Sequence, residues 1–408
     1  MDDLAPPAGL EHRLAAELQR LRAADLYRVR RAVEGGHGVA LTVQGRPCVN
    51  FCSNDYLGLA ADPRLAQAAK RSLDASGTGS GASALVSGYN AEHARLEEEL
   101  AEFLGRPRVL LFSSGWAANV GVLRALLGRD DVLVADELNH ASLIDGGRLS
   151  GAQYQRVPHA SLGGFGRALR QAKADGREAL LVTDGVFSMD GDLADLPALS
   201  TLCETHGASL MVDDAHGFGV FGAHGEGSLQ LLSHPAAPLP PPLVHVATLG
   251  KSLGASGAFV AGSEDLIEYL IQRARSWVFS TAPPPAIAAA ARAALRIVRE
   301  EPQRQQQLHD NIALFRAGAA QLGLPLGVPG IAQQEPFTPI QPLVLGAEAR
   351  ALALSQYLYE RGWWVAAIRP PTVPRGTSRL RITLSAAHTA AQIDGLLQAL
   401  AEGLRAQS

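Results

Sequence analysis

Cysteine is scarce in this sequence, and neither sign of charge dominates it. Cys48, Cys52 and Cys203 form an odd and sparse set among 408 residues, which excludes a disulfide framework in so long a chain. We therefore expect reduced thiols and a cytoplasmic protein. The 36 basic residues are balanced by 40 acidic ones. Nucleic acid is not expected as a partner, because its binders need a dominant basic field.

Long hydrophobic runs are also missing. The alanine-rich run that begins at Ala286 is interrupted by Arg292 and Arg296. No stretch approaches the roughly 18 uninterrupted apolar residues that a membrane-spanning helix needs. The start, Met1 to Leu4, is acidic and lacks the basic and apolar regions of a secretory signal. We expect a protein that is neither exported nor embedded in a membrane.

Three common functional patterns are absent as well. The glycines of 77–81 resemble a dinucleotide fingerprint, but no strand precedes them and the third glycine is misplaced, which excludes a Rossmann NAD site. The Gly-x-Ser-x-Gly spacing occurs only at 250–254, where it contains Lys251, and we do not interpret it as the nucleophile elbow of the α/β hydrolases. The segment 248–252 ends like a phosphate-binding P-loop, but His245 stands where that loop requires glycine. Lys251 therefore needs another explanation.

What the sequence does contain is an alternation of short apolar runs with helical patterns. With 47% hydrophobic and 19% charged residues, the composition is that of a globular protein. The runs are apolar on both faces, which is typical of parallel strands covered by helices on both sides. We predict an α/β fold with a mainly parallel sheet. Its strands include 109–112, 132–135, 179–183, 209–212, 243–247 and 257–261.

A chain of this length is expected to form more than one domain. Residues 1–50 are interpreted as an N-terminal helical segment with short strands, and residues 51–285 as the large α/β domain. Residues 286–408, which begin with a long helical stretch to about Leu322, are interpreted as a smaller α+β domain. A proline cluster at 238–242 indicates a loop inside the large domain.

Two polar residues follow predicted strands in a way that suggests a cofactor. Ligands of parallel sheets bind at the carboxyl edge of the strands. Lys251 comes just after the run 243–247, where an aldehyde can bond to its amine. Asp213 ends the run 209–212, where a carboxylate can pair with a protonated pyridine nitrogen. This pair points to pyridoxal 5′-phosphate (PLP).

Other strand ends carry compatible residues. His216 can reach the phenolic oxygen of the cofactor or position Asp213, and no metal is expected because no second histidine or cysteine lies at ligand spacing. The segment 112–119 opens a helix whose free amides suit a phosphate. His140 can stack on the pyridine ring, and Ser188 can donate to a cofactor oxygen. Each signal alone has an ordinary structural explanation, but several at consecutive strand ends favour one site.

Seven short motifs, spread over nearly the whole chain, carry a family resemblance. They are Ser53–Leu59, Gly79–Gly81, Val86–Gly88, Asn139–Ser142, Asp184–Asp192, Asp213–Gly217 and Thr248–Lys251. Together they resemble the α-oxoamine synthases, which are PLP enzymes of the aspartate aminotransferase fold (fold type I). Members of this family condense an amino acid with an acyl thioester and release CO2. The resemblance implies this fold, PLP, and a homodimer in which Ser280 and Thr281 reach the neighbouring subunit's phosphate.

The resemblance also implies a role for individual residues. Lys251 is expected to carry PLP as a Schiff base, Asp213 to pair with the pyridinium, and His140 to stack on the ring and contact the substrate. Further expected cofactor contacts are Gly115, Trp116, Ser188, His216 and Thr248. Trp116 stands where phenylalanine or tyrosine is expected, which leaves its backbone contact intact but alters the packing of the ring.

The C-terminal motifs imply the substrates. The segments 367–374, 379–381 and 385–388 most resemble the branch of the family that joins L-alanine to a pimeloyl thioester, carried by coenzyme A or by an acyl carrier protein, in biotin biosynthesis. By resemblance, Arg28 and Thr372 bind substrate.

Two alternatives stay open at this point. The C-terminal core also resembles sister synthases, of the 5-aminolevulinate synthase and 2-amino-3-ketobutyrate ligase types, that use glycine with shorter thioesters. By resemblance, Arg381 clamps the amino-acid carboxylate in a bidentate pair in either case. A catalytically silent binding protein is disfavoured, because it has no chemical need for Lys251, Asp213 and His140 together.

Overall fold

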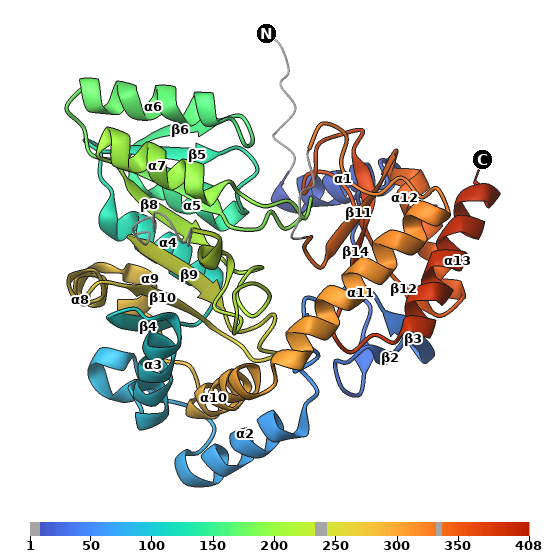
Figure 1. The fold of residues 1–408 in the computed structure, drawn as a ribbon, viewed down its shortest axis with the longest axis horizontal. Coiled ribbons are helices and arrows are strands. Elements are labelled where there is room, and N and C mark those ends of the chain that lie inside the picture. The colour runs from blue at the N-terminus through green and yellow to red at the C-terminus, as the bar shows by residue number, and fades with distance from the viewer. Residues whose placement is uncertain (1–8, 233–242, 332–336, 408) are drawn as a thin grey trace.

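A computed structural model describes residues 9–232, 243–331 and 337–407, so the predicted loop at 238–242 lies outside the described residues. Within these ranges the strands form three sheets, of seven, four and three strands. In Figure 1 the large sheet with its helices and the C-terminal elements lie side by side, with α10 (Pro285–Glu300) on one part and α11 (Pro302–Gln321) on the other. None of the described helices is long and apolar enough to cross a membrane.

The seven-stranded sheet is the centre of the large α/β part. Its strands, in spatial order, are β4 (Arg108–Phe112), β10 (Ala258–Gly262), β9 (Val244–Thr248), β8 (Ser209–Asp213), β7 (Ala179–Asp184), β5 (Val132–Asp136) and β6 (Gln153–Val157). The five strands from β9 to β6 are parallel, and β10 runs antiparallel to both of its neighbours. The predicted mainly parallel sheet is confirmed.

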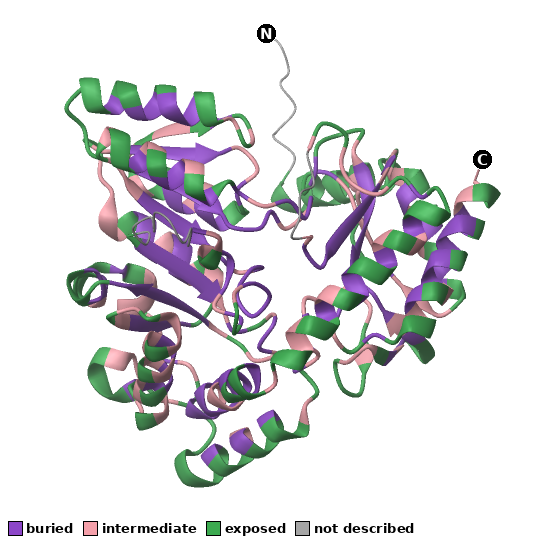
Figure 2. Ribbon diagram, viewed as in Figure 1, coloured by how far each residue is buried: buried purple, intermediate pink, exposed green. Residues whose placement is uncertain are grey.

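Helices cover both faces of this sheet, as the two-sided apolar runs predict. On β5, Val132 and Val134 pack into a cluster with α6 and α7, whereas Leu133 and Ala135 pack into a cluster with α4 and α5. Figure 2 accordingly shows buried strands between helices that are exposed on their outer sides. The helices of this part are α2 (Pro63–Ser76), α3 (Ala91–Leu104), α4 (Gly115–Leu126), α5 (Ala141–Ser150), α6 (Leu162–Ala174), α7 (Leu196–His206), α8 (Glu264–Arg273), α9 (Arg275–Val278) and α10 (Pro285–Glu300), with a π-helical turn (Ala84–Gly88) and a 3-10 turn (Ser228–Leu232).

Among the described residues, the C-terminal part combines two small sheets with four helices. One sheet is antiparallel, in the order β11 (Ile340–Gly346), β14 (Ser378–Thr383) and β13 (Ala366–Ile368). The other joins β1 (Val33–Glu34), β2 (Ala40–Val43) and β3 (Arg46–Asn50) to β12 (Trp363–Trp364). The remaining helices are α1 (Leu10–Ala23), α11 (Pro302–Gln321), α12 (Glu348–Glu360) and α13 (Ala390–Ala406). Because strands from both ends of the chain share a sheet, the division at residues 50 and 285 stays a prediction.

The long helical stretch expected after Ala286 is in fact two helices. The chain leaves helical geometry at Glu301, and Pro302 then starts α11. Proline is favoured at the first position of a helix, because its missing N–H would have no partner there. The break lies where the chain passes from the large part to the C-terminal part.

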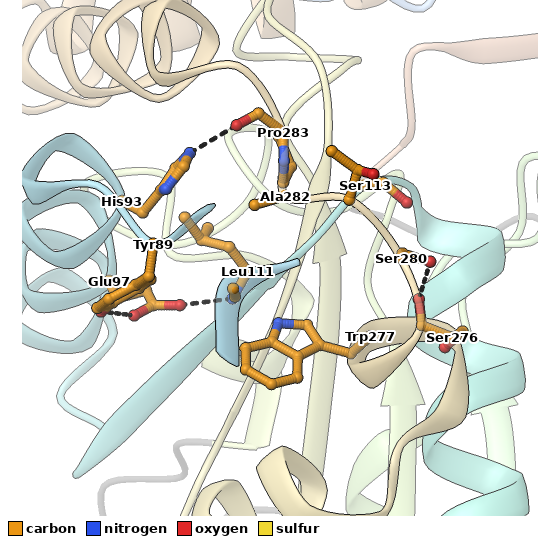
Figure 3. A pocket seen from close by; sticks show the side chains of 12 residues that line it. Tyr89, His93, Glu97, Leu111, Ser113, Ser276, Trp277, Ser280, Ala282 and Pro283 are labelled. Atoms are coloured by element: carbon orange, nitrogen blue, oxygen red, sulfur yellow. Dashed lines mark hydrogen bonds between the residues drawn. The ribbon is translucent and has the colours of Figure 1, made fainter. Parts of the chain in front are cut away.

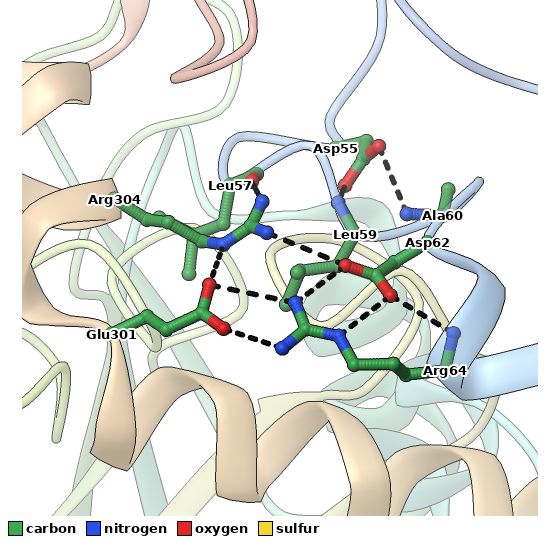
Figure 4. A network of polar contacts seen from close by, with 8 residues as sticks. All are labelled: Asp55, Leu57, Leu59, Ala60, Asp62, Arg64, Glu301 and Arg304. Atoms are coloured by element: carbon green, nitrogen blue, oxygen red, sulfur yellow. Dashed lines mark hydrogen bonds and ion pairs between the residues drawn. The ribbon is translucent and has the colours of Figure 1, made fainter. Parts of the chain in front are cut away.

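A network of ion pairs stabilises this junction (Figure 4). Asp62, which caps α2, pairs with Arg64 at 2.8 Å. Glu301 pairs with Arg304 at 2.6 Å and also with Arg64. Arg304 donates a further hydrogen bond to the carbonyl oxygen of Leu57 at 3.3 Å. The network therefore holds the start of α11 against α2.

Candidate active site

The parallel strands bring the predicted site residues to one edge of the sheet. Asp184 at the end of β7 lies beside Asp213 at the end of β8, in register. The backbone N–H of His140 donates to Asp184 Oδ2 at 2.7 Å, which holds the segment after β5 at the same edge. Lys251 follows β9, the next parallel strand. Residues from four strand ends thus surround one point.

Lys251 lies in a tight, largely buried turn. Its Nζ is 2.9 Å from His216 Nε2. Burial lowers the pKa of Lys251 to about 8, although the negative charge of Asp213 acts in the opposite direction. The turn needs glycine at position 254, because a Cβ there would lie 2.3 Å from the backbone nitrogen of Ala60. An amine with this pKa is partly unprotonated near neutral pH and is therefore a competent nucleophile and base.

The carboxylate of Asp213 is buried and fully oriented. Its Oδ1 accepts from the backbone N–H of Ala215 at 3.0 Å, and its Oδ2 accepts from Asn119 Nδ2 at 2.6 Å. The neighbouring Asp184 differs, because its burial and then the charge of Asp213 raise its pKa well above the ordinary value. Of the two carboxyl groups, that of Asp213 is therefore the better suited to pair with a cation, because two hydrogen bonds orient it as a carboxylate.

His140 is the N-cap of α5 and also lies over the site. Burial lowers the pKa of its imidazole, and the positive charge of Lys251 lowers it further against the opposing effect of Asp213. The ring meets that of Trp116 edge to face, with 6.2 Å between centroids. Its Nδ1 is 2.7 Å from Ser142 Oγ. His140 therefore has both roles: it caps α5, as a lone histidine often does, and it lies close to Asp213 and Lys251.

His216 connects Lys251 to the C-terminal part through a chain of hydrogen bonds. Its Nδ1 is 2.7 Å from the hydroxyl of Tyr56, and this hydroxyl donates to Asn54 Oδ1 at 3.2 Å. Burial and then the charge of Lys251 lower the pKa of His216 well below the ordinary value, so the ring is neutral. Arg381 Nη1 donates to the same Asn54 oxygen at 3.1 Å. The chain thus runs from the amine to an arginine of β14.

Arg381 is buried and retains a free donor. Its Nε donates to the carbonyl oxygen of Ser188 at 2.6 Å, which places Ser188 beside it. Its Nη2 has no hydrogen-bond partner among the described residues. A buried guanidinium N–H without a partner costs free energy unless a ligand supplies an acceptor. This geometry suits a carboxylate.

The N-terminus of α4 is open beside Gly115. A Cβ at Gly115 would meet no atom within 4 Å, so there is space next to the first turn of the helix. Ser114 caps the helix by accepting from the backbone N–H of Ala117 at 3.2 Å, and Trp116 is 47% exposed. Helix N-termini of this kind favour phosphate groups.

Thr248 lies at the end of β9, where its hydroxyl donates to the carbonyl oxygen of Gly257 at 3.0 Å.

Arg28 and Thr372 also lie together, although 344 positions separate them in the sequence. Arg28 Nη2 donates to Thr372 Oγ1 at 3.2 Å, at the exposed edge of the C-terminal part. Thr372 and Ser188 both line a cavity of about 130 Å³, whose other walls include the side chains of Leu138 and Phe187. A mostly apolar cavity lined by a hydroxyl to which a guanidinium donates suits an acyl chain with a polar end.

Ser280 and Thr281 line a different and smaller cavity, of about 30 Å³ (Figure 3). There the Tyr89 hydroxyl donates to Glu97 at 2.5 Å, and burial raises the pKa of Glu97 to about 7. Lys251 does not line this cavity. Within one chain, therefore, the two residues are not part of the site at the sheet edge.

Several residues of the site were not identified from the sequence. They are Asn54, Tyr56, Asn119, Ser142 and Asp184, and each lies inside a segment that the sequence analysis singled out. Asn119 and Ser142 are almost completely buried, at 1% and 0% exposure. For Asn119, the available signal was a polar residue in the mostly apolar helix α4. In the described part of the chain, no cluster of three His, Cys, Asp or Glu residues is arranged to hold a metal ion.

The described residues fit PLP. Lys251 would supply an amine for its aldehyde, Asp213 a carboxylate for its ring nitrogen, and His140 an imidazole for its ring face. The open turn at Gly115 supplies amides for its phosphate. The partly unprotonated amine and the open helix end are the two observations on which this fit depends.

Comparison with known proteins identifies the family. A model of "aminotransferase class I and II" matches residues 46–400. The chain is 57% identical over 391 residues to 8-amino-7-oxononanoate synthase from Methylococcus capsulatus, which covers 96% of this chain and 98% of that protein. It is 52% identical over 392 residues to the protein of the same name from Thioalkalivibrio sulfidiphilus, covering 96% and 97% of the two chains.

Solved structures agree with this assignment. A serine palmitoyltransferase from Sphingomonas wittichii superimposes with a TM-score of 0.89 at 31% identity, covering 98% of this chain and 99% of that one. The crystal structure of 8-amino-7-oxononanoate synthase from Francisella tularensis gives a TM-score of 0.73 at 30% identity, covering 88% and 98%. The chain therefore belongs to the class I and II aminotransferase family and, within it, to the family of the 8-amino-7-oxononanoate synthases.

Proposed function

We propose that this protein condenses L-alanine with a pimeloyl thioester to give 8-amino-7-oxononanoate, CO2 and free thiol, a reaction of biotin biosynthesis. The observation that carries the proposal is the convergence of Lys251, Asp213 and Arg381 on one edge of the sheet. This set combines an amine, a cation-binding carboxylate and a carboxylate-binding guanidinium. The likeness over the full chain to relatives of that name supports the choice of substrates.

The proposed roles follow from the geometry of each side chain. PLP, when bound, supplies an aldehyde that bonds to amines and a ring that holds the negative charge developing at Cα. Lys251 is the attachment point at rest and, once the amino acid has displaced it, the base that takes the Cα proton onto Nζ. Asp213 keeps the proton on the ring nitrogen, and His140 covers the face of the ring.

Other residues act on the two substrates. Arg381 binds the alanine carboxylate through its free Nη2 and orients the Cα–H bond toward Lys251. The bond from Cα to the thioester carbonyl carbon then forms while the thiol leaves. The carboxylate departs as CO2, and a proton returns to Cα. Arg28 and Thr372 bind the far end of the acyl chain, next to the 130 Å³ cavity that Ser188 also lines.

We also propose that the protein works as a homodimer in the cytoplasm. Val86 and Phe279, with exposures of 79% and 71%, lie in segments flanking the small cavity and suit burial by a second copy. In such a dimer Ser280 and Thr281 would contact the phosphate held by the neighbouring subunit. Cysteines 48, 52 and 203 are unpaired, which is compatible with a reducing compartment.

Product analysis tests the proposed reaction. The protein with PLP is offered alanine and glycine in competition, together with pimeloyl and succinyl thioesters of coenzyme A and of acyl carrier protein. Mass spectrometry should find 8-amino-7-oxononanoate as the main product. Discrimination against glycine need not be absolute, because one methyl group is worth about 1–3 kcal/mol in an apolar pocket. Dominant condensation of glycine with the succinyl thioester would overturn the assignment to biotin biosynthesis while leaving the fold unchanged.

A further inference from the structure

Asn119 and Ser142 link the two groups that flank the proposed position of the cofactor ring. Asn119 is on α4 and Ser142 on α5, and both are almost completely buried. Asn119 Nδ2 is 2.6 Å from Asp213 Oδ2 and 2.8 Å from Ser142 Oγ. The amide nitrogen has two hydrogens to donate and cannot accept a hydrogen bond, whereas a carboxylate can only accept. One hydrogen therefore goes to Asp213 and the other to Ser142.

Among the described residues, Ser142 Oγ has two hydrogen-bond partners, Asn119 Nδ2 and His140 Nδ1. Because Oγ accepts from Asn119, its single hydrogen is available to His140 Nδ1, which lies 2.7 Å away. The backbone N–H of Ser142 also points at Nδ1, at 3.3 Å. Both donors require a lone pair on this nitrogen. The hydrogen of the neutral imidazole therefore resides on Nε2.

We propose that Asn119 and Ser142 are positioning residues that fix His140 as a neutral imidazole with its hydrogen on Nε2. The side of the ring not held by Ser142 can then donate a hydrogen bond to an oxygen, but it has no lone pair with which to take a proton. The consequence rests on the proposed function: His140 stacks on the cofactor ring and donates a hydrogen bond through Nε2, while Lys251 alone removes the Cα proton. The same amide of Asn119 also orients the Asp213 carboxylate. One side chain thus influences both the tautomer of His140 and the orientation of Asp213.

A purely structural role makes a different prediction. His140 caps α5, and the hydrogen bonds of Ser142 also stabilise this helix end. If this were their only purpose, changing Ser142 would lower stability but leave the position of the imidazole hydrogen unchanged. The tautomer of His140 therefore separates the two explanations.

The tautomer can be read directly in the PLP-free protein. Long-range ¹H–¹⁵N correlation spectra of ¹⁵N-histidine-labelled protein distinguish a protonated ring nitrogen from an unprotonated one, and His140→Asn identifies the relevant signals. We expect Nδ1 to be unprotonated and Nε2 protonated. A hydrogen found on Nδ1 would overturn the proposal. This measurement does not depend on which substrates are consumed, so its failure is distinct from a failure of the proposed reaction.

Variants of Ser142 sharpen the test. Ser142→Ala removes the O–H donor, so the Nδ1 signal should shift toward the protonated range and kcat/KM for the amino acid should fall roughly tenfold. Ser142→Thr keeps the hydroxyl and should restore the wild-type tautomer. Ser150→Ala, at the far end of α5, is the matched control, because its hydroxyl donates to the carbonyl oxygen of Gly147 and accepts from the backbone N–H of Ala152, with no bond to His140. An unchanged His140 spectrum in Ser142→Ala would contradict the positioning role.

Discussion

The sheet edge around Lys251 and the junction between α2 and α11 are built from the same kinds of groups in different surroundings. At the junction the side chain of Arg64 is 46% exposed, and its hydrogen bonds lower the pKa of Asp62. At the sheet edge Asp184 is buried, and its pKa moves in the opposite direction. The difference is that at the edge the loss of water outweighs every favourable contact of the carboxylate, whereas at the junction the hydrogen bonds of Arg64 outweigh it. Burial, more than the choice of residues, separates a reactive network from a stabilising one.

The largest expected effect comes from removing the buried amine. Lys251→Ala should lose covalently bound PLP, and activity should fall roughly 10⁴-fold, because the base for the Cα proton is gone. Borohydride reduction of the PLP-loaded wild type and peptide mapping should place the label on Lys251. The exposed lysines Lys70 and Lys173 provide matched controls, and their alanine variants should keep both label and activity. Label on either of them would contradict the assignment.

A smaller loss is expected when the buried carboxylate becomes an amide. Asp213→Asn should retain some PLP but lose activity about a thousandfold, which corresponds to ~4 kcal/mol, because a neutral amide cannot hold the proton on the ring nitrogen. Steady-state kinetics measure this loss. Asp184→Asn is the internal control and should lose much less, because the backbone N–H of His140 donates to Asp184 Oδ2, a bond that the amide oxygen of asparagine can also accept. Near-normal turnover of Asp213→Asn would refute the role.

The pH dependence of stability tests the burial of Lys251 in the PLP-free protein. Its pKa is about 8 in the folded chain, whereas the ordinary value is 10.5. Between these values the unfolded chain binds a proton that the folded chain has released, so stability rises with pH across this window. Below pH 8 both states are protonated and the penalty is complete. Denaturant unfolding from pH 7.5 to 10.5 should therefore show the wild type gaining about 3 kcal/mol relative to Lys251→Met. A constant difference between the two proteins would exclude the lowered pKa.

The smallest effect is expected at the junction. Glu301→Gln removes a charge that pairs with Arg64 and Arg304, but the group is close to water, so the free energy of unfolding should change by less than about 1 kcal/mol. The change should shrink further at high salt, because salt screens exposed charges. Urea titrations at low and high salt measure both quantities. If Glu301→Gln lowered the free energy of unfolding by several kcal/mol, as expected for an unpaired buried charge, the difference in exposure would not explain the contrast between the junction and the sheet edge.

Part of this structure was predictable because the signals are local. The runs of β5, β7 and β8 are apolar on both faces, so their burial between helices followed from the sequence. The strand β6 was not predicted, because at the sheet edge its residues Gln153, Gln155 and Arg156 face water. The break between α10 and α11 was also overlooked, although Pro302 marked it.

The candidate site divides in the same way. Lys251 and Asp213 were found because each directly follows a strand. Asn119 and Ser142 were not, because their importance depends on a contact between two helices, and a helical pattern does not specify which helices meet. The pairing of Arg28 with Thr372 was suggested only by resemblance to a family, since 344 positions separate them. Ser280 and Thr281 stay predictions that require a second subunit.

The hydrogen bond between Asn54 and Arg381 joins positions 327 apart in the sequence. A ribosome therefore delivers the two partners at nearly opposite ends of synthesis. The strands of the parallel sheet and Lys251 are translated before β14, so the chain carries its reactive amine before the arginine proposed to bind the amino acid. Fidelity toward the amino acid is thus a property of the finished chain, and premature termination before β14 yields a protein that has its reactive amine but lacks the arginine proposed to select a carboxylate.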